Sequence, residues 1–69
     1  MKWIDMSETQ RFWTLKTMSQ RGGGFAGALA DAWMRADSTN SRRLALAFPD
    51  LVLRYGPKSD LYTQPKETT

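Results

Sequence analysis

Apolar residues recur at the spacing of an α-helix through the middle of the chain, most clearly in the stretch that ends at Ala36. On a helical wheel with about 100° per residue, one side collects Phe25, Ala26, Ala28, Leu29, Ala32, Trp33 and Ala36. The opposite side collects Gly27, Asp31 and Met34. Alanines between large side chains let a second helix approach closely and pack between the aromatic ridges. The pattern therefore predicts that this stretch is the central helix of the core.

A first helix is predicted to begin at about Glu8 and to end at Gln20 or Arg21. Ser7 and Gln10 have the spacing of a capping box, in which each residue satisfies a backbone N–H of the other. Three glycines follow the helix, and glycine readily ends one. The inner stripe is predicted to consist of Phe12, Leu15 and Met18, with Trp13 at its edge. The positions predicted to face water are Arg11, Thr14 and Thr17.

A third helix is predicted after a polar break at residues 37–40. This run is rich in helix-capping side chains, so Asp37 or Ser38 is expected to be the N-cap. The helix should then extend from about Thr39 to Ala47. Its inward side chains are predicted to be Leu44, Ala47 and Phe48.

Pro49 suits the first position of a helix, so residues 49–55 are predicted to form a short fourth helix or a kinked continuation. The Gly-Pro pair that follows should end it. Beyond that pair the chain is mostly polar, a composition typical of disorder. We therefore predict an all-α fold: a small bundle of three to four short helices forming a single domain over residues 1–56, with a flexible, largely disordered C-terminal tail over 57–69.

The composition argues against catalysis. The 69 residues include no cysteine and no histidine, which removes the thiolate nucleophile, the commonest general base and the usual zinc ligands. The carboxylates each have a local structural task or lie near an end of the chain, so no acid–base pair can be assigned. We predict that the protein is not an enzyme and holds no cofactor or metal. The apolar runs are too short to span a bilayer and no secretory leader is present, so we expect the bacterial cytoplasm.

Residues 22–27 read Gly-Gly-Gly-Phe-Ala-Gly and so match the pattern G-x-G-x-x-G. That fingerprint binds dinucleotides only when a strand precedes it within a crossover unit. Here a helix is predicted before it, and the chain is too short to hold such a sheet. We interpret the glycines as a hinge between two helices.

The net charge of +3 lies in the predicted helical body, where seven basic residues outnumber four acidic ones. Such a body could favour nucleic acid or an acidic protein surface, and it is equally typical of ordinary solubility. The second and third helices also fit a helix-turn-helix, in which the early residues of the second helix meet base edges. The nucleic-acid contacts in that interpretation are Thr39, Asn40, Ser41, Arg42 and Arg43. Against it, the recognition helix would be short and flanked by Asp37 and Asp50.

Eight aromatic residues are many for a chain of this length, and a small domain leaves some of them partly exposed. Trp, Tyr, Met and Arg are enriched where proteins bind one another. The candidate contacts to a protein partner are Trp13, Met34, Arg42 and Arg43. A structural role stays open for each: packing at the edge of the core for Trp13, a second packing contact for Met34, and a solvated face or an ion pair for the two arginines.

The segment over residues 11–56 resembles small proteins encoded by phages and prophages of Gram-negative bacteria. The resemblance is carried by LADAWMRADSTNSRRL at residues 29–44 and AFPDLVLRYG at residues 47–56. It implies that the chain binds and blocks a host protein, as anti-CRISPR and other anti-defence proteins do, or that it regulates transcription. No catalytic or binding residue is carried over from the resemblance.

The leading hypothesis is a phage-type interaction protein that binds and modulates or inhibits a host or phage protein, with a homodimer as a further option. The alternative is a small helix-turn-helix-like, DNA-binding regulator of transcription, which makes nucleic acid the less favoured partner. A virion or packaging component is a third option, and no membrane partner is expected.

Overall fold

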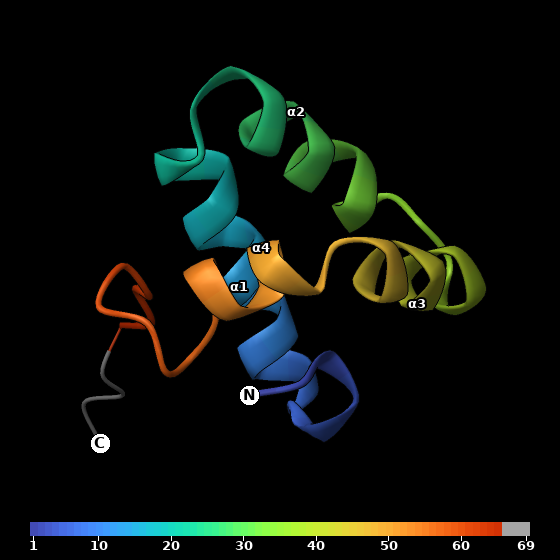
Figure 1. Cartoon of the computed structure of the whole chain (residues 1–69), viewed down its shortest axis with the longest axis horizontal. Helices are drawn as coiled ribbons and strands as arrows, with labels where there is room; N and C mark the ends of the chain where they lie inside the picture. Colours follow the sequence, from blue (N-terminus) through green and yellow to red (C-terminus); the bar gives the residue numbers. More distant parts are fainter. Residues whose placement is uncertain (66–69) are drawn as a thin grey trace.

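Four α-helices and one short 3₁₀ helix make up the fold, and no strand occurs within residues 1–65, the part of the chain that the computed structural model describes (Figure 1). The 3₁₀ helix η1 spans Trp3–Asp5, α1 spans Glu8–Arg21 and α2 spans Gly23–Met34. Helix α3 spans Ser38–Ala47 and α4 spans Pro49–Tyr55. The all-α prediction is confirmed. No helix in this part of the chain has the length and apolar character needed to cross a bilayer.

Helix α1 begins and ends where the sequence indicates. The Gln10 backbone N–H donates to Ser7 Oγ (3.1 Å), and the Ser7 backbone N–H donates to Gln10 Oε1 (2.9 Å), which confirms the capping box. At the other end the Gly22 N–H donates to the Met18 carbonyl (2.8 Å), and Gly23 then starts α2 with a φ of 71°. Gly22 alone thus joins α1 to α2, and these two helices make the most extensive contact in the fold.

The buried stripe of α1 differs from the predicted one. Leu15 and Met18 are buried as predicted. Thr14 and Thr17, which are predicted to face water, are fully buried, and Phe12, predicted inward, is exposed. The Thr14 hydroxyl donates to the carbonyl four residues earlier (2.7 Å), so its burial leaves no polar atom unpaired. A threonine whose hydroxyl is satisfied behaves as a small β-branched residue, which suits close packing between helices.

The core-facing side of α2 matches the predicted one only in part, with Ala26 and Trp33 buried as predicted. Its buried residues are Ala26, Gly27, Ala30 and Trp33. Gly27 is predicted to face outward but lies close to α1, where a Cβ at its position would be 3.4 Å from the Ser19 carbonyl. Phe25, Ala28 and Ala32 are predicted inward but are exposed. Small residues form the face toward α1 because they allow the closest approach of the two helices.

Helices α3 and α4 follow one another with only Phe48 between them. Asp37 caps α3 as predicted, since its Oδ1 accepts the Asn40 backbone N–H (2.8 Å). Phe48 leaves the helical conformation with φ −127° and ψ 57°, and Pro49 starts α4 as predicted. The two helices therefore form a kinked pair.

Trp33 is the centre of the core, with 1% of its surface exposed. Its ring packs on Trp3 with centroids 5.0 Å apart, and its Nε1 donates to Ser41 Oγ (2.9 Å). These contacts join α2 to η1 and to α3. Because Ser41 and the buried Ala45 share one side of α3, this side faces the core, and Ala47, which is predicted inward, is exposed on another side.

Residues 57–65, predicted as part of the flexible tail, return to the helical body. Leu61 packs against the core, and the Thr63 N–H donates to the buried Thr17 Oγ1 (3.0 Å). Thr17 gives this segment a polar anchor that the sequence pattern does not reveal. The rest of the predicted tail, 66–69, lies outside the described residues.

Candidate partner-binding surface

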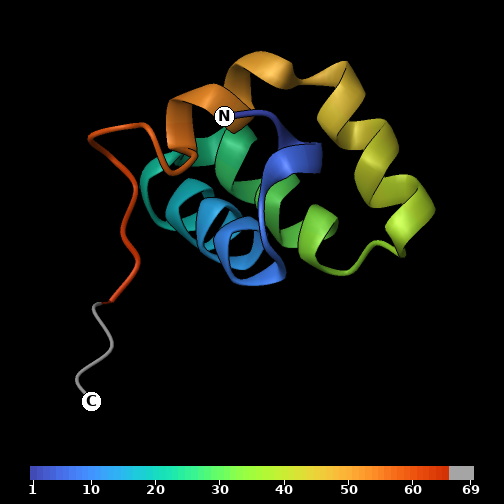
Figure 2. The ribbon, with the colours of Figure 1, turned by 90° about the horizontal axis from the view of Figure 1, so that it is seen from below.

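A groove of about 480 Å³ opens between η1 on one side and the α3–α4 pair on the other, and Figure 2 shows η1 beside α3 with α4 across their ends. We call it the main groove. Its lining residues are Met1, Lys2, Trp3, Ile4, Arg42, Ala45, Leu46, Pro49, Val52 and Leu53. Only Lys2 and Arg42 among them are charged, so the main groove is apolar with a basic rim.

One wall of the main groove is a stripe of side chains that continues from α3 into α4. Its members are Arg42, Ala45 and Leu46 from α3 and Pro49, Val52 and Leu53 from α4. Ala45 and Val52 are buried and form the base of this wall, whereas Leu46 and Leu53 are 74% and 57% exposed. The stripe thus presents two leucines to solvent above a base of smaller side chains.

The opposite wall is η1, and Arg11 holds it in place. Arg11 Nε donates to the Trp3 carbonyl (3.0 Å), and its Nη2 donates to the Ile4 carbonyl (3.3 Å). The guanidinium carbon also lies 5.5 Å from the centroid of the Trp3 ring, within the range of a cation–π contact. Arg11 is therefore half-buried and structural, a correction to its predicted position facing water. Ile4, fixed by this contact, is 65% exposed beside the main groove.

Two further hollows continue this surface beyond Trp3. A second hollow of about 430 Å³ shares Ile4 and Arg42 with the main groove and adds Thr39. A third hollow of about 420 Å³ is lined by Phe12 and Met34, and it shares Trp3 with the other two. We call the three together the hollowed face.

Most of the large apolar side chains exposed within residues 1–65 lie on the hollowed face. Those that line it are Ile4, Phe12, Met34, Leu46 and Leu53. The remaining one, Phe25, packs edge-on against Phe48 with ring centroids 6.0 Å apart and lines none of the three hollows. Exposed apolar side chains are therefore gathered on this face rather than scattered.

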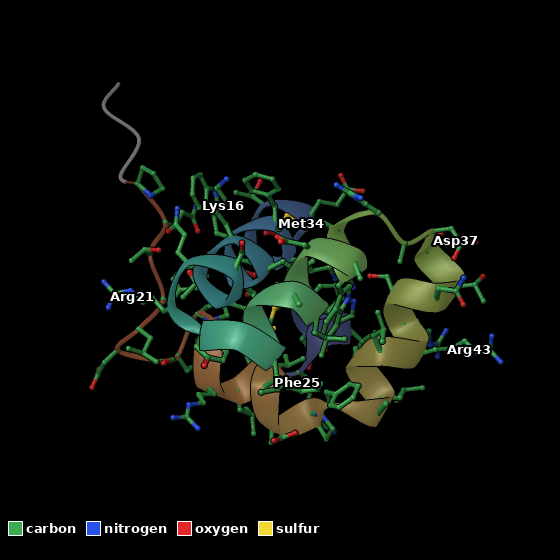
Figure 3. The ribbon with its side chains drawn as sticks, turned by 90° about the horizontal axis from the view of Figure 1, so that it is seen from above. Lys16, Arg21, Phe25, Met34, Asp37 and Arg43 are labelled. Carbon is green, nitrogen blue, oxygen red and sulfur yellow. The ribbon has the colours of Figure 1, made fainter. Side chains whose placement is uncertain are left out.

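The four predicted partner contacts do not form one cluster. Arg42 lines the main groove and the second hollow, and Met34 lines the third. Arg43 points away from the body on the outer side of α3, where it donates to Asn40 Oδ1 (3.5 Å) (Figure 3). Trp13 is half-buried and lines none of the three hollows. The hollowed face thus contains Met34 and Arg42 and leaves the other two outside it.

The five predicted nucleic-acid contacts are also divided. Ser41 is half-buried and accepts the hydrogen bond of Trp33, so its hydroxyl faces the core. Thr39 and Arg42 line the second hollow, whereas the Asn40 carboxamide bonds to Arg43. Four of the five predicted contacts are exposed: Thr39, Asn40, Arg42 and Arg43.

The charges around the main groove and the second hollow have one sign. The charged lining residues there are Lys2, Arg11 and Arg42. Asp5 belongs to η1 but lines neither hollow, and Glu8 lies at the third. The charged side chains that line these two hollows are therefore all basic.

The acidic side chains of the described residues are not gathered into a metal-binding group. Within residues 1–65, no three acidic side chains lie close enough together to hold a metal ion. Burial raises the pKa of the Tyr62 hydroxyl above its ordinary value, but this group belongs to the C-terminal segment and lines none of the three hollows. What the hollowed face can do is contact another apolar surface.

Sequence reasoning missed most of this surface, although a signal for part of it is present. Leu46 and Leu53 are seven residues apart, and both line the main groove together with Arg42. Ile4 and Phe12 carry no such signal, because their exposure depends on how η1 and α1 pack. Comparison of the chain with protein-family models, with curated proteins and with solved structures gives no match.

Proposed function

We propose that the protein is a small, non-enzymatic interaction protein of phage type that binds a host or phage protein and modulates or inhibits it. One observation carries the proposal: five large apolar side chains are exposed along the hollowed face, three at the main groove and two at the third hollow. Monomeric proteins seldom expose contiguous apolar surface, and where they do it commonly marks a binding site. In this proposal the helices form a small bundle that works in the bacterial cytoplasm, and anti-defence is one role that such binding would serve.

The free energy available from burying these side chains is large enough for a binding site. Full burial of a leucine or isoleucine side chain is worth about 1.5–3 kcal/mol, and Ile4, Leu46 and Leu53 each have more than half of their surface still to bury. Energy in protein interfaces concentrates in a few such central residues, with a polar rim around them. Lys2 and Arg42 provide the polar rim around these apolar side chains.

Photo-crosslinking tests the proposal directly. Leu46 is replaced by p-benzoyl-phenylalanine, and the matched control carries the same group at Phe25, which is comparably exposed but lies off the hollowed face. In lysate of the bacterium that encodes the chain, we expect one dominant adduct from position 46 and none of that mass from position 25. Added wild-type protein should compete for the adduct. Leu46→Asp protein should compete at least about tenfold more weakly, because it places a charge where the complex would bury an apolar side chain. Equal labelling from both positions would contradict the proposal.

The alternative, a DNA-binding regulator, is favoured by one feature. Helices α2 and α3 are joined by a short polar turn, and α3 exposes Thr39, Arg42 and Arg43 within its first six residues. Fluorescence anisotropy with a mixed-sequence duplex decides it. If α3 enters a groove of DNA, binding is expected at about 50 mM salt, and the double substitution Arg42→Ala, Arg43→Ala should weaken it about tenfold or more. Absence of binding, or binding that the double substitution leaves unchanged, removes this alternative.

A further inference from the structure

We propose that the main groove accepts an amphipathic helix of the partner protein, with an apolar stripe in the groove and acidic side chains beside it. This inference rests on the proposed function and specifies the chemistry of the partner. It is carried by the shape of the α3–α4 wall and by the sign of the charges at its rim.

The α3–α4 wall offers exposed side chains beside a buried base. Leu46 on α3 and Leu53 on α4 are exposed on either side of the kink at Phe48, and the buried Ala45 and Val52 lie beside them in the same groove. Helices pack when the ridges of one enter the grooves of the other, and leucines above smaller residues provide both features. An incoming helix would place an apolar side chain between the two leucines and against the buried base of the wall.

The other common modes of peptide recognition fit this groove less well. Addition of a strand needs an exposed sheet edge, and residues 1–65 contain no strand. Recognition of polyproline segments uses grooves lined with aromatic rings, whereas Trp3 is the one aromatic residue that lines the main groove. The lining is mainly aliphatic, as in the grooves that accept amphipathic helices.

Charge determines what should flank the apolar stripe of the partner. Lys2 and Arg42 line the main groove, and Arg11 lies in the adjoining hollow, while no acidic residue lines either one. Acidic side chains on the incoming helix would therefore meet a complementary rim, which favours the encounter and fixes orientation. A second copy of this chain would do the opposite, because a two-fold contact through the same face sets basic rim against basic rim.

The test uses a displayed library of helical peptides as the probe. Each peptide has a fixed stripe of leucines at helical spacing, and the flanking positions vary between glutamate and lysine. Selection on the full-length protein is expected to enrich peptides with glutamate flanks. In solution, a selected peptide should bind the Leu46→Asp protein at least about tenfold more weakly, whereas the Phe25→Asp protein, altered at an exposed apolar residue outside the groove, should bind as the wild type does. Far-UV circular dichroism on both variants checks that they remain folded.

A charge exchange makes the test specific. The Arg42→Glu protein should bind the glutamate-flanked peptide about fivefold more weakly and should prefer the same peptide with lysine flanks. The inference is overturned if selection on the wild type enriches lysine-flanked peptides or no peptide at all, or if the selected peptides bind the Leu46→Asp protein as tightly as the wild type. It is also overturned if light scattering shows that the wild type is a dimer and that the Leu46→Asp protein is a monomer. If position 46 crosslinks to a partner but the peptides show no acidic preference, the partner chemistry is wrong while the proposed function stands. If crosslinking at position 46 also fails, both fail.

Discussion

Replacement of Trp33 by alanine is expected to leave the chain largely unfolded. Trp33 is 1% exposed, and through Trp3 and Ser41 it joins its own helix α2 to two other elements, η1 and α3. Truncation of a buried tryptophan to alanine costs about 3–5 kcal/mol. Domains as small as this one have stabilities near the low end of the usual range of about 5–15 kcal/mol, so the loss is comparable with the whole stability. Loss of the cooperative thermal transition in far-UV circular dichroism would be the sign.

Two matched variants show how much of the lost stability comes from the burial of Trp33 and how much from its hydrogen bond. Trp13→Ala removes a tryptophan that is only half-buried, and it should keep a cooperative transition at a modestly lower temperature. Trp33→Phe retains most of the volume but removes the Nε1 donor, leaving Ser41 Oγ without this partner. That change is expected to cost about 1–3 kcal/mol, measured by urea unfolding. A Trp33→Ala protein as stable as the wild type would contradict the central position given to this side chain.

Gly22→Ala is expected to be the second most damaging substitution, because it forces α1 and α2 apart at their junction. A Cβ at Gly22 would lie 2.5 Å from the Met18 carbonyl and 2.7 Å from the Ala26 Cβ, and neither atom can move without displacing a helix. Overpacking of this kind costs about 1–3 kcal/mol. Denaturant unfolding should show the loss as a lower midpoint with little change in slope.

Gly24→Ala is the natural control for that experiment. Gly24 lies two residues away, inside the first turn of α2, and a Cβ there would meet no atom within 4 Å. Alanine is favoured over glycine in a helix by up to about 1 kcal/mol, so this variant should be as stable as the wild type or more so. Equal destabilisation by the two substitutions would show that the close approach at Gly22 does not limit stability.

The helix ends could be predicted because the signals for them are local. The Ser7–Gln10 capping box, the Asp37 cap and Pro49 each act within one turn of the chain, and each occurs as the sequence indicates. Residue type and spacing alone determine such contacts. The run of glycines marks the junction between α1 and α2, but the hinge predicted over residues 22–27 is wrong in extent, because Gly22 alone joins the helices and residues 23–27 belong to α2.

The faces of the helices were harder to predict, because they depend on which helix lies opposite. A helical wheel gives most weight to large apolar residues, so it directs Phe12 and Phe25 inward, whereas both are exposed. The contact between α1 and α2 instead uses small residues, with Gly27 buried close to α1 and Thr14 buried on α1. Close approach of two backbones outweighed the burial of the larger rings.

The candidate surface was also hard to predict, because residues from separate elements form it. The stripe that includes Leu46 and Leu53 crosses the junction at Phe48, and a periodicity analysis that treats 39–47 and 49–55 as separate helices does not connect the two leucines. The opposite wall depends on Arg11, whose contacts with the Trp3 and Ile4 carbonyls join residues that no local pattern relates. Arg42 could be named because an exposed arginine is a common binding residue whatever its surroundings.

The way in which Arg11 holds the N-terminal wall has a consequence for how recognition can change. Arg11 bonds to main-chain carbonyl oxygens, which every amino acid supplies, and not to the side chains of Lys2 or Ile4. Substitutions at these two exposed positions can therefore alter the shape and charge of one groove wall while the fold stays intact. A lineage under pressure from a changing target could diversify there first, with the scaffold left untouched.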